Sequence, residues 1–291
     1  TTHAPVDGKV RVIAPFASDN TNPAGGINAG ASDMAKWMIA QLDSGRTASG
    51  RLWSERTARN IWTIVTPIGI GAPPPELPAF RASFNGYGLG VGIRDYRGLK
   101  LLTHTGGLPG YVSRVATLPD KKAGVAVLTN AESTNAFDAI VQQVLDWFIG
   151  ANDTDWLGGL TKLQARADSA LKSEEAQSVA SRNTASRPSL PLAKYAGTYR
   201  DAWYGDVTIA DEGGKLVMRF TRSPQLVGDM EHWQYDSFLV KWRDRELRAD
   251  AFVTFALTPQ GGIDEAKMAP ASSSVDFSYD FQDLLLKPVT R

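Results

Sequence analysis

The stretch HTGGLPGYVSRVATLPDKKAGVAVLTN, residues 104–130, contains the pattern on which the fold prediction depends. Pro119 and Asp120 separate its two apolar runs, and two further runs precede it, separated by Arg97 and Gly98. All four have the composition of β-strands: 87–93, 100–104, 111–118 and 124–129. Because short turns join antiparallel neighbours, the sequence predicts an antiparallel sheet.

Helical periodicity flanks the predicted sheet. Apolar residues recur at helical spacing in three segments: 32–45, 54–62 and 136–149. The residues before Pro23 show no such pattern and are expected to be irregular. Val125 to Leu128 form a continuous apolar run, which is typical of a strand covered on both faces. We therefore expect an α+β domain at 1–150, with the last of these helices on one face of its sheet.

The remainder of the chain divides into a linker and a second domain. Residues 151–189 are polar, and a thin apolar stripe between Leu160 and Ser181 predicts a helix within this linker. Residues 190–291 contain short strand-like runs between Asp, Gly and Pro turns: 205–209, 215–221, 233–235, 238–242, 251–257, 263–268 and 275–279. This spacing predicts a small all-β barrel or sandwich.

Composition limits the functions that the chain can have. The 291 residues carry a formal net charge of zero, so no basic surface for nucleic acid is expected. No apolar run approaches the roughly 20 residues of a membrane span. Cysteine is absent, which excludes disulfides, thiolate metal sites and a cysteine nucleophile. His3, His104 and His232 lack metal-ligand spacing, and we expect neither a metal nor a cofactor.

The residues most suggestive of chemistry are His104, Thr105, Gly106 and Gly107. In a strand, side chains alternate between faces, so this segment carries little bulk at its end. One interpretation is that the glycines allow a substrate backbone to approach closely. The alternative is that they form a bulge or begin the turn that follows, which would require no function.

Three motifs occur in order along the first half of the chain: PAGGINAGASDMAKWMIAQL at 23–42, YGLGVGI at 87–93 and the stretch at 104–130. With these motifs the chain resembles the C-terminal part of the serine β-lactamase and penicillin-binding protein superfamily, in its class C β-lactamase, esterase and D-aminopeptidase-like branch. The resemblance covers roughly residues 1–150. It implies that His104, Thr105 and Gly106 occupy the place of the Lys-Thr-Gly triplet on the strand beside the active site.

The resemblance also implies roles for these residues in an acyl-enzyme mechanism. His104 would assist proton movement or steer a substrate carboxylate, and Thr105 would donate its hydroxyl to the substrate. Gly106 would allow the substrate to approach the strand closely, and Gly107 would donate its backbone N–H to the oxyanion of the reacting carbonyl group. The implied substrate is a small acyl, peptide or lactam compound.

The serine nucleophile that this mechanism needs is not assigned in the chain. The family's Ser-x-x-Lys and Tyr-x-Asn motifs lie in an N-terminal half that precedes this region. Ser169 and Lys172 match the first motif by spacing, but they follow the triplet strand instead of preceding it. Ser83 and Asn85 imitate a Ser-x-Asn motif directly before a strand. We interpret both as chance matches and expect a complementary N-terminal half to complete the sheet.

Residues 190–291 resemble the lipocalin-like C-terminal domain of unknown function found in some members of this family. The supporting stretches are YAGTYRDAWYGDVTIADEGGKLVMRF at 195–220 and HWQYDSFLVKWRD at 232–244. Their aromatic residues could line a ligand pocket or form the barrel core: Trp203, Tyr204, Phe220, Trp233, Tyr235, Phe238 and Trp242.

Two functions from different classes follow from these observations. The first is part of a serine hydrolase that cleaves an amide, lactam or ester, inactive as this chain alone. Because histidine replaces a lysine, esterase or peptidase activity is favoured over β-lactamase activity. The second is a non-catalytic ligand-binding or structural module with the same fold. The resemblance also implies a bacterial periplasmic or secreted protein, and a homo-oligomer is compatible with it.

Overall fold

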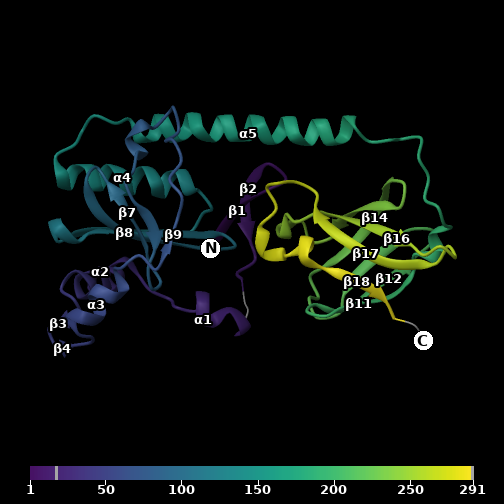
Figure 1. Ribbon diagram of the computed structural model, residues 1–291, viewed down its shortest axis with the longest axis horizontal. Coiled ribbons are helices and arrows are strands. Elements are labelled where there is room, and N and C mark those ends of the chain that lie inside the picture. The colour runs from purple at the N-terminus through teal and green to yellow at the C-terminus, as the bar shows by residue number, and fades with distance from the viewer. Residues whose placement is uncertain (17–18, 290–291) are drawn as a thin grey trace. The chain divides into compact units, whose positions relative to one another are not determined.

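The computed structural model describes residues 1–16 and 19–289 (Figure 1). The chain forms two compact units, Thr1–Ala167 and Asp168–Arg291. The division falls inside one long helix, α5 (Trp156–Ala180), within the segment that the sequence predicts to be a helical linker. In the described part of the chain, no helix combines the length and the apolar composition that crossing a membrane requires.

The first unit begins with a β-hairpin, where the sequence led us to expect irregular structure. Strand β1 (Thr2–Val6) pairs antiparallel with β2 (Lys9–Ile13). Asp7 and Gly8 form the turn with φ values of 49° and 76°, the left-handed conformation that favours Asp-Gly in two-residue hairpin loops. The expectation was therefore wrong because the Asp-Gly turn was overlooked.

A six-stranded antiparallel sheet forms the centre of the first unit, in the order β10-β9-β8-β7-β6-β5. Its strands are β5 (Thr66–Pro67), β6 (Asn85–Tyr87), β7 (Gly92–Tyr96), β8 (Leu99–Leu108), β9 (Tyr111–Leu118) and β10 (Ala123–Thr129). The single strand expected at 87–93 is in fact two strands. Gly88 N–H donates to Val91 C=O at 2.8 Å, and Gly90 has φ 78°, so the glycines close a tight turn between β6 and β7.

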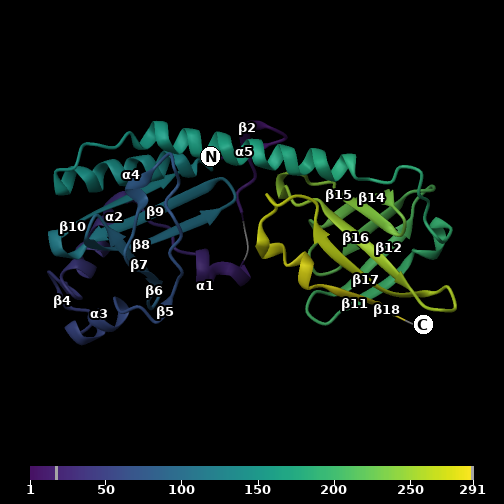
Figure 2. The same cartoon turned by 45° about the horizontal axis from the view of Figure 1, so that its top comes forward.

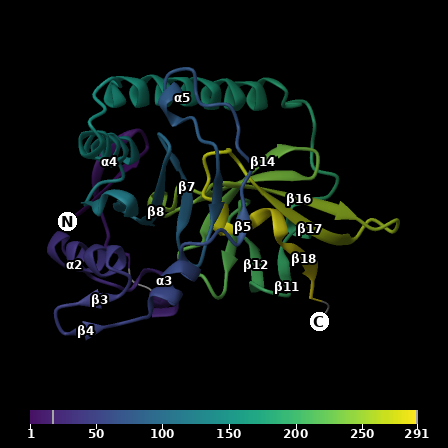
Figure 3. The same cartoon turned by 60° about the vertical axis from the view of Figure 1, so that its left-hand side comes forward.

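Three helices of the first unit lie close to their predicted positions: α2 (Ala31–Leu42), α3 (Glu55–Ile61) and α4 (Thr134–Ile149). The short helix α1 (Asn22–Gly25) was not predicted. The Ser54 hydroxyl accepts from Thr57 N–H and so caps α3 at the predicted residue. A short hairpin of β3 (Arg46–Thr47) and β4 (Gly50–Arg51) joins α2 to α3 (Figure 3).

Helices of this chain lie on both faces of the sheet. Val141 and Leu145 of α4 pack with Leu101 and Leu118 in a buried cluster, and Figure 2 shows α4 along this face. On the other face, a Cβ added at Gly124 would lie 3.3 Å from Met38 Sδ of α2. The apolar run of β10 is thus covered in part on both faces, although Leu128 remains 41% exposed. Helix α2 therefore supplies part of the cover on the second face, and completion of this face by an N-terminal half stays a prediction.

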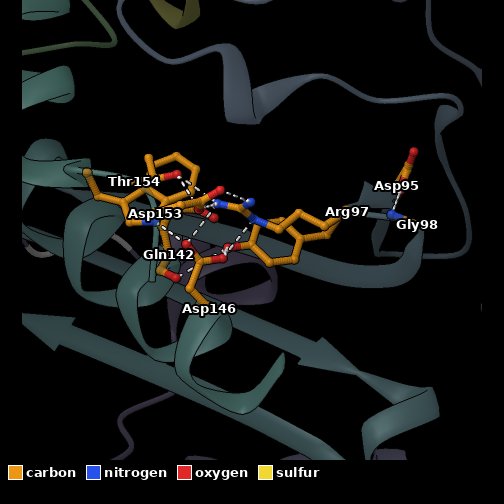
Figure 4. A network of polar contacts seen from close by, with 9 residues as sticks. Asp95, Arg97, Gly98, Gln142, Asp146, Asp153 and Thr154 are labelled. Carbon is orange, nitrogen blue, oxygen red and sulfur yellow. Dashed lines mark hydrogen bonds and ion pairs between the residues drawn. The ribbon is translucent and has the colours of Figure 1, made fainter. Parts of the chain in front are cut away.

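A buried carboxylate connects three segments of the first unit (Figure 4). Asp146 is 1% exposed and accepts hydrogen bonds from Tyr96 Oη at 2.6 Å and Trp156 Nε1 at 2.7 Å. Arg97 Nε lies 2.9 Å from Asp146 Oδ1, and the same guanidinium also reaches Asp153. Burial raises the pKa of Tyr96, and the bond to Asp146 raises it further. The network fixes the end of β7, the helix α4 and the start of α5.

The second unit contains a closed eight-stranded antiparallel barrel. Its strands are β11 (Gly197–Asp201), β12 (Gly205–Asp211), β13 (Leu216–Phe220), β14 (Val227–Gln234), β15 (Ser237–Trp242), β16 (Ala251–Leu257), β17 (Ile263–Pro270) and β18 (Leu285–Pro288). The strand expected at 275–279 was wrong. Asp276 caps a 3₁₀ turn at Phe277–Tyr279 through Ser278 N–H, and β18 closes the barrel instead.

The aromatic residues of the barrel separate into two groups. Phe220, Phe238 and Trp242 are at most 2% exposed and belong to the core. Trp203 and Tyr235 are 67% and 57% exposed, and both follow the end of a strand. The predicted strand at 233–235 accordingly lies further upstream, as β14, and Tyr235 adopts φ 47° in the turn after it.

Candidate active site at the free edge of strand β8

Strand β8 extends beyond its neighbour on one side. Strand β9 pairs with it as far as Leu108, whereas β7 pairs only with Leu99 to Thr103. Residues His104 to Gly107 are all exposed. No strand of the described ranges 1–16 and 19–289 pairs with these four residues on the β7 side. The residues that the sequence singled out therefore lie together on a free strand edge.

The glycine pair is part of a regular ladder. Gly106 pairs with Ser113 and Gly107 with Val112, without a register shift. The bulge interpretation was therefore wrong, and the turn begins only after Leu108. A Cβ at Gly106 would lie 2.6 Å from Ser113 Oγ, so packing within the chain explains this glycine. A Cβ at Gly107 would meet nothing within 4 Å, so the chain's own packing does not explain the second glycine.

The register determines which backbone groups face the free edge. Leu108 and Tyr111 flank a two-residue loop, and such flanking residues form a hydrogen-bonded pair. Hydrogen-bonded and non-hydrogen-bonded pairs alternate along an antiparallel ladder. The backbone groups of Thr105 and Gly107 are therefore directed away from β9. They can pair with an extended chain at this edge.

His104 forms a polar pair with Tyr87, a residue that the sequence pattern did not identify as functional. His104 Nδ1 lies 2.6 Å from the carbonyl oxygen of Thr105, and Nε2 lies 2.8 Å from Tyr87 Oη. A carbonyl oxygen only accepts, so Nδ1 carries a proton. The Nε2 of a neutral imidazole then accepts from the Tyr87 hydroxyl. The pair can move a proton between a reacting group and the imidazole.

An apolar cavity opens beside His104. Its volume is about 130 Å³, and it lies among α2, the end of α3, the turn before β7 and strands β8 and β9. Its lining residues are Trp37, Gln41, Ile61, Trp62, Leu89, Gly90, Val91, Leu102, Thr103, His104, Val115 and Thr117. Within the described part of the chain, no group of three or more His, Asp or Glu side chains could hold a metal ion.

The two chance matches to nucleophile motifs lie elsewhere. The hydroxyl and the backbone N–H of Ser83 both donate to Asp95 Oδ2. Burial raises the pKa of Asp95, but the hydrogen bonds from Ser83 and Gly98 outweigh it and lower the pKa. Ser169 is exposed on α5 and belongs to the second unit, whereas His104 belongs to the first. Among the described residues, no serine hydroxyl bonds to His104 or Tyr87.

Two family models match separate parts of the chain. Residues 1–145 match the family model described as "Beta-lactamase". These residues belong to the serine β-lactamase and penicillin-binding protein superfamily. Residues 181–288 match a second model, described as "Domain of unknown function (DUF3471)".

Two fungal relatives of this chain are named hydrolases. Unguisins hydrolase ungD of Aspergillus violaceofuscus is 29% identical and covers 82% of this chain and 45% of its own length. Unguisins hydrolase ungD' of Aspergillus campestris is 27% identical, with 67% of this chain and 36% of its own length covered. The chain therefore spans less than half the length of these curated relatives.

Among solved structures, the octameric penicillin-binding protein homologue from Pyrococcus abyssi aligns with a TM-score of 0.35 at 16% identity. The alignment covers 88% of this chain and 46% of that one.

Proposed function

We propose that this chain supplies the substrate-binding strand and a proton-transfer pair to a serine hydrolase that cleaves an amide, lactam or ester through an acyl-enzyme. The observation that carries the proposal is the position of the His104–Tyr87 pair at the free edge of β8, on the strand that also carries Gly107. The named hydrolases among the relatives support a hydrolytic activity.

The proposed reaction assigns each group a step. A serine from a complementary N-terminal half attacks the substrate carbonyl carbon, and its hydroxyl proton passes to a neighbouring base. Gly107 N–H donates to the developing oxyanion, and Thr105 pairs with the substrate backbone. The leaving group departs with a proton, and water then hydrolyses the acyl-serine ester. Tyr87 and His104 assist these proton transfers through the hydrogen bond between Oη and Nε2.

Histidine at position 104 favours substrates that need no firm contact to a carboxylate. Histidine is not a permanent cation as lysine is, so it holds a substrate carboxylate less firmly at neutral pH. Arg114 on β9 is no substitute, because it forms an ion pair with Asp138. We therefore propose peptides or esters, in preference to β-lactams, as the substrate class.

Active-site labelling tests the proposal. The protein that joins this chain to its N-terminal half is treated with a fluorescent fluorophosphonate, with and without the change His104→Ala. We expect labelling on a serine outside this chain and a rate reduced by about 10²- to 10⁴-fold in the variant, the usual contribution of general acid–base catalysis.

The control is His232→Ala, because His232 bonds to Tyr235 C=O in the barrel. It should label at the unmodified rate. Absence of labelling in the unmodified protein would favour the non-catalytic module, and equal rates in all three proteins would exclude the role of His104.

A further inference from the structure

We propose that the cavity beside His104 binds one apolar group of the substrate, an acyl chain or side chain of about the size of a leucine or phenyl group. This inference rests on the proposed function and adds a substrate preference to it.

The size of the cavity matches a single side chain. Its volume is about 130 Å³. An apolar protein cavity of roughly 150 Å³ accepts benzene, so one branched aliphatic or phenyl group is the largest group expected here. Trp37 and Leu89 are 45% and 58% exposed and line the opening. Covering their apolar surface would favour binding.

The lining of the cavity contains no permanently charged side chain. The twelve lining residues include no Lys, Arg, Asp or Glu, and His104 is the one titratable side chain among them. An ionised group placed here would lose its hydration without a permanently charged partner. Gln41 and Thr117 supply uncharged polar atoms, so a neutral group is favoured.

The position of the cavity connects it to the reacting bond. Val115 lies directly opposite His104 in the ladder, so both side chains project from the same face of the sheet. An extended substrate on the edge of β8 would direct alternate side chains to this face. The group that enters the cavity is therefore one close to the scissile carbonyl.

The test uses the complete protein and p-nitrophenyl acetate, butyrate and hexanoate. For the unmodified enzyme we expect kcat/KM to rise by about four-fold per added methylene group. Val115→Phe fills the cavity and should reverse this order while the acetate is still cleaved. Leu89→Ala changes an exposed residue of the opening and should reduce the hexanoate-to-acetate ratio by about three-fold or more.

The matched control is Leu128→Phe, on the edge strand β10 outside the cavity, which should leave the ratios unchanged. If the Val115 and Leu89 variants cleave the three esters with the chain-length preference of the unmodified enzyme, the inference is overturned but the proposed function is not. This result is expected if another part of the complete protein fills the cavity. No turnover of any ester would overturn the proposed function together with the inference.

Discussion

The two units of the chain differ in whether the edges of their strands are paired. The barrel pairs all eight strands in a ring, and 21 buried residues of its described part form one apolar cluster. The sheet of the first unit is open, its edge strand β10 leaves Leu128 exposed, and β8 has a free edge over four residues. Closure removes the edges at which other chains can pair, whereas a free edge can bind one. The comparison suggests that the barrel is structurally self-sufficient and that the sheet is available for binding.

The largest expected effect is a difference in thermal unfolding between the two units when each is produced as a separate fragment. Residues 168–291 are expected to melt in a single cooperative transition, because their core is closed within the barrel. Residues 1–167 are expected to aggregate or to melt without cooperativity, because their sheet edges and apolar residues are exposed. Calorimetry of the two fragments measures this difference. A cooperative, monomeric transition in the first fragment would break the comparison.

One tryptophan in each unit allows the packing of the two units to be compared directly. Trp242 is 1% exposed and donates its indole N–H to Ala249 C=O at 2.6 Å, whereas Trp37 is 45% exposed. Trp242→Ala should lower the free energy of unfolding of the barrel by about 3–5 kcal/mol. Trp37→Ala should cost about 1 kcal/mol or less, because little packing is lost. Urea unfolding of both variants measures the two losses in free energy of unfolding, and equal losses would contradict the prediction.

The free edge itself can be blocked by a change that removes one donor. Gly107→Pro eliminates the N–H that faces the edge, and the Cβ that it adds meets no atom within 4 Å. We expect kcat of the complete enzyme to fall by about 10²- to 10³-fold, the usual effect of losing an oxyanion donor. Gly71→Pro, in a loop that is also open, is the control. Similar kcat values for both variants would show that the edge is not used.

The smallest expected effect is a change in the acid stability of the barrel. Burial raises the pKa of Asp236, but hydrogen bonds from Tyr195 and Ser189 outweigh it and hold the pKa below its ordinary value of 3.8. A carboxylate with a lowered pKa stabilises the folded state above that ordinary value and loses this contribution as the pH falls through the folded-state pKa. The Tm of the barrel should therefore decrease as the pH falls below about 4.

Asp236→Asn should reduce the Tm at neutral pH and flatten this acid-dependent decrease. Asp264→Asn, a change at an exposed residue paired with Lys287, is the control and should leave the pH profile intact. An identical pH profile in the Asp236 variant and the unmodified protein would contradict the assignment.

Local sequence signals predicted most of the fold. The spans of β9 and β16 match the predicted residues, because alternating apolar residues between clear turns determine both ends. The hairpin β1–β2 was missed although Asp7 and Gly8 carried the turn signal. Strand β18 could not be located from its four residues, because its place is set by closure of the barrel against β11 and β17.

The candidate site was predicted in part. The resemblance indicated residues 104–107, and the structure places them together on the free edge. Tyr87 was not identified, because its contact with His104 joins residues 17 positions apart through a turn that the sequence analysis interpreted as continuous strand. The tyrosine preceding the two turn glycines Gly88 and Gly90 was the signal that could have revealed it.

A crystal structure of the complete protein after phosphonylation tests the central claim most directly. We predict that the phosphonyl oxygen lies about 3 Å from Gly107 N, with the Oη–Nε2 bond between Tyr87 and His104 beside it. A modified serine remote from β8, or a strand of the protein itself paired with Thr105 and Gly107 in place of substrate, would contradict the account.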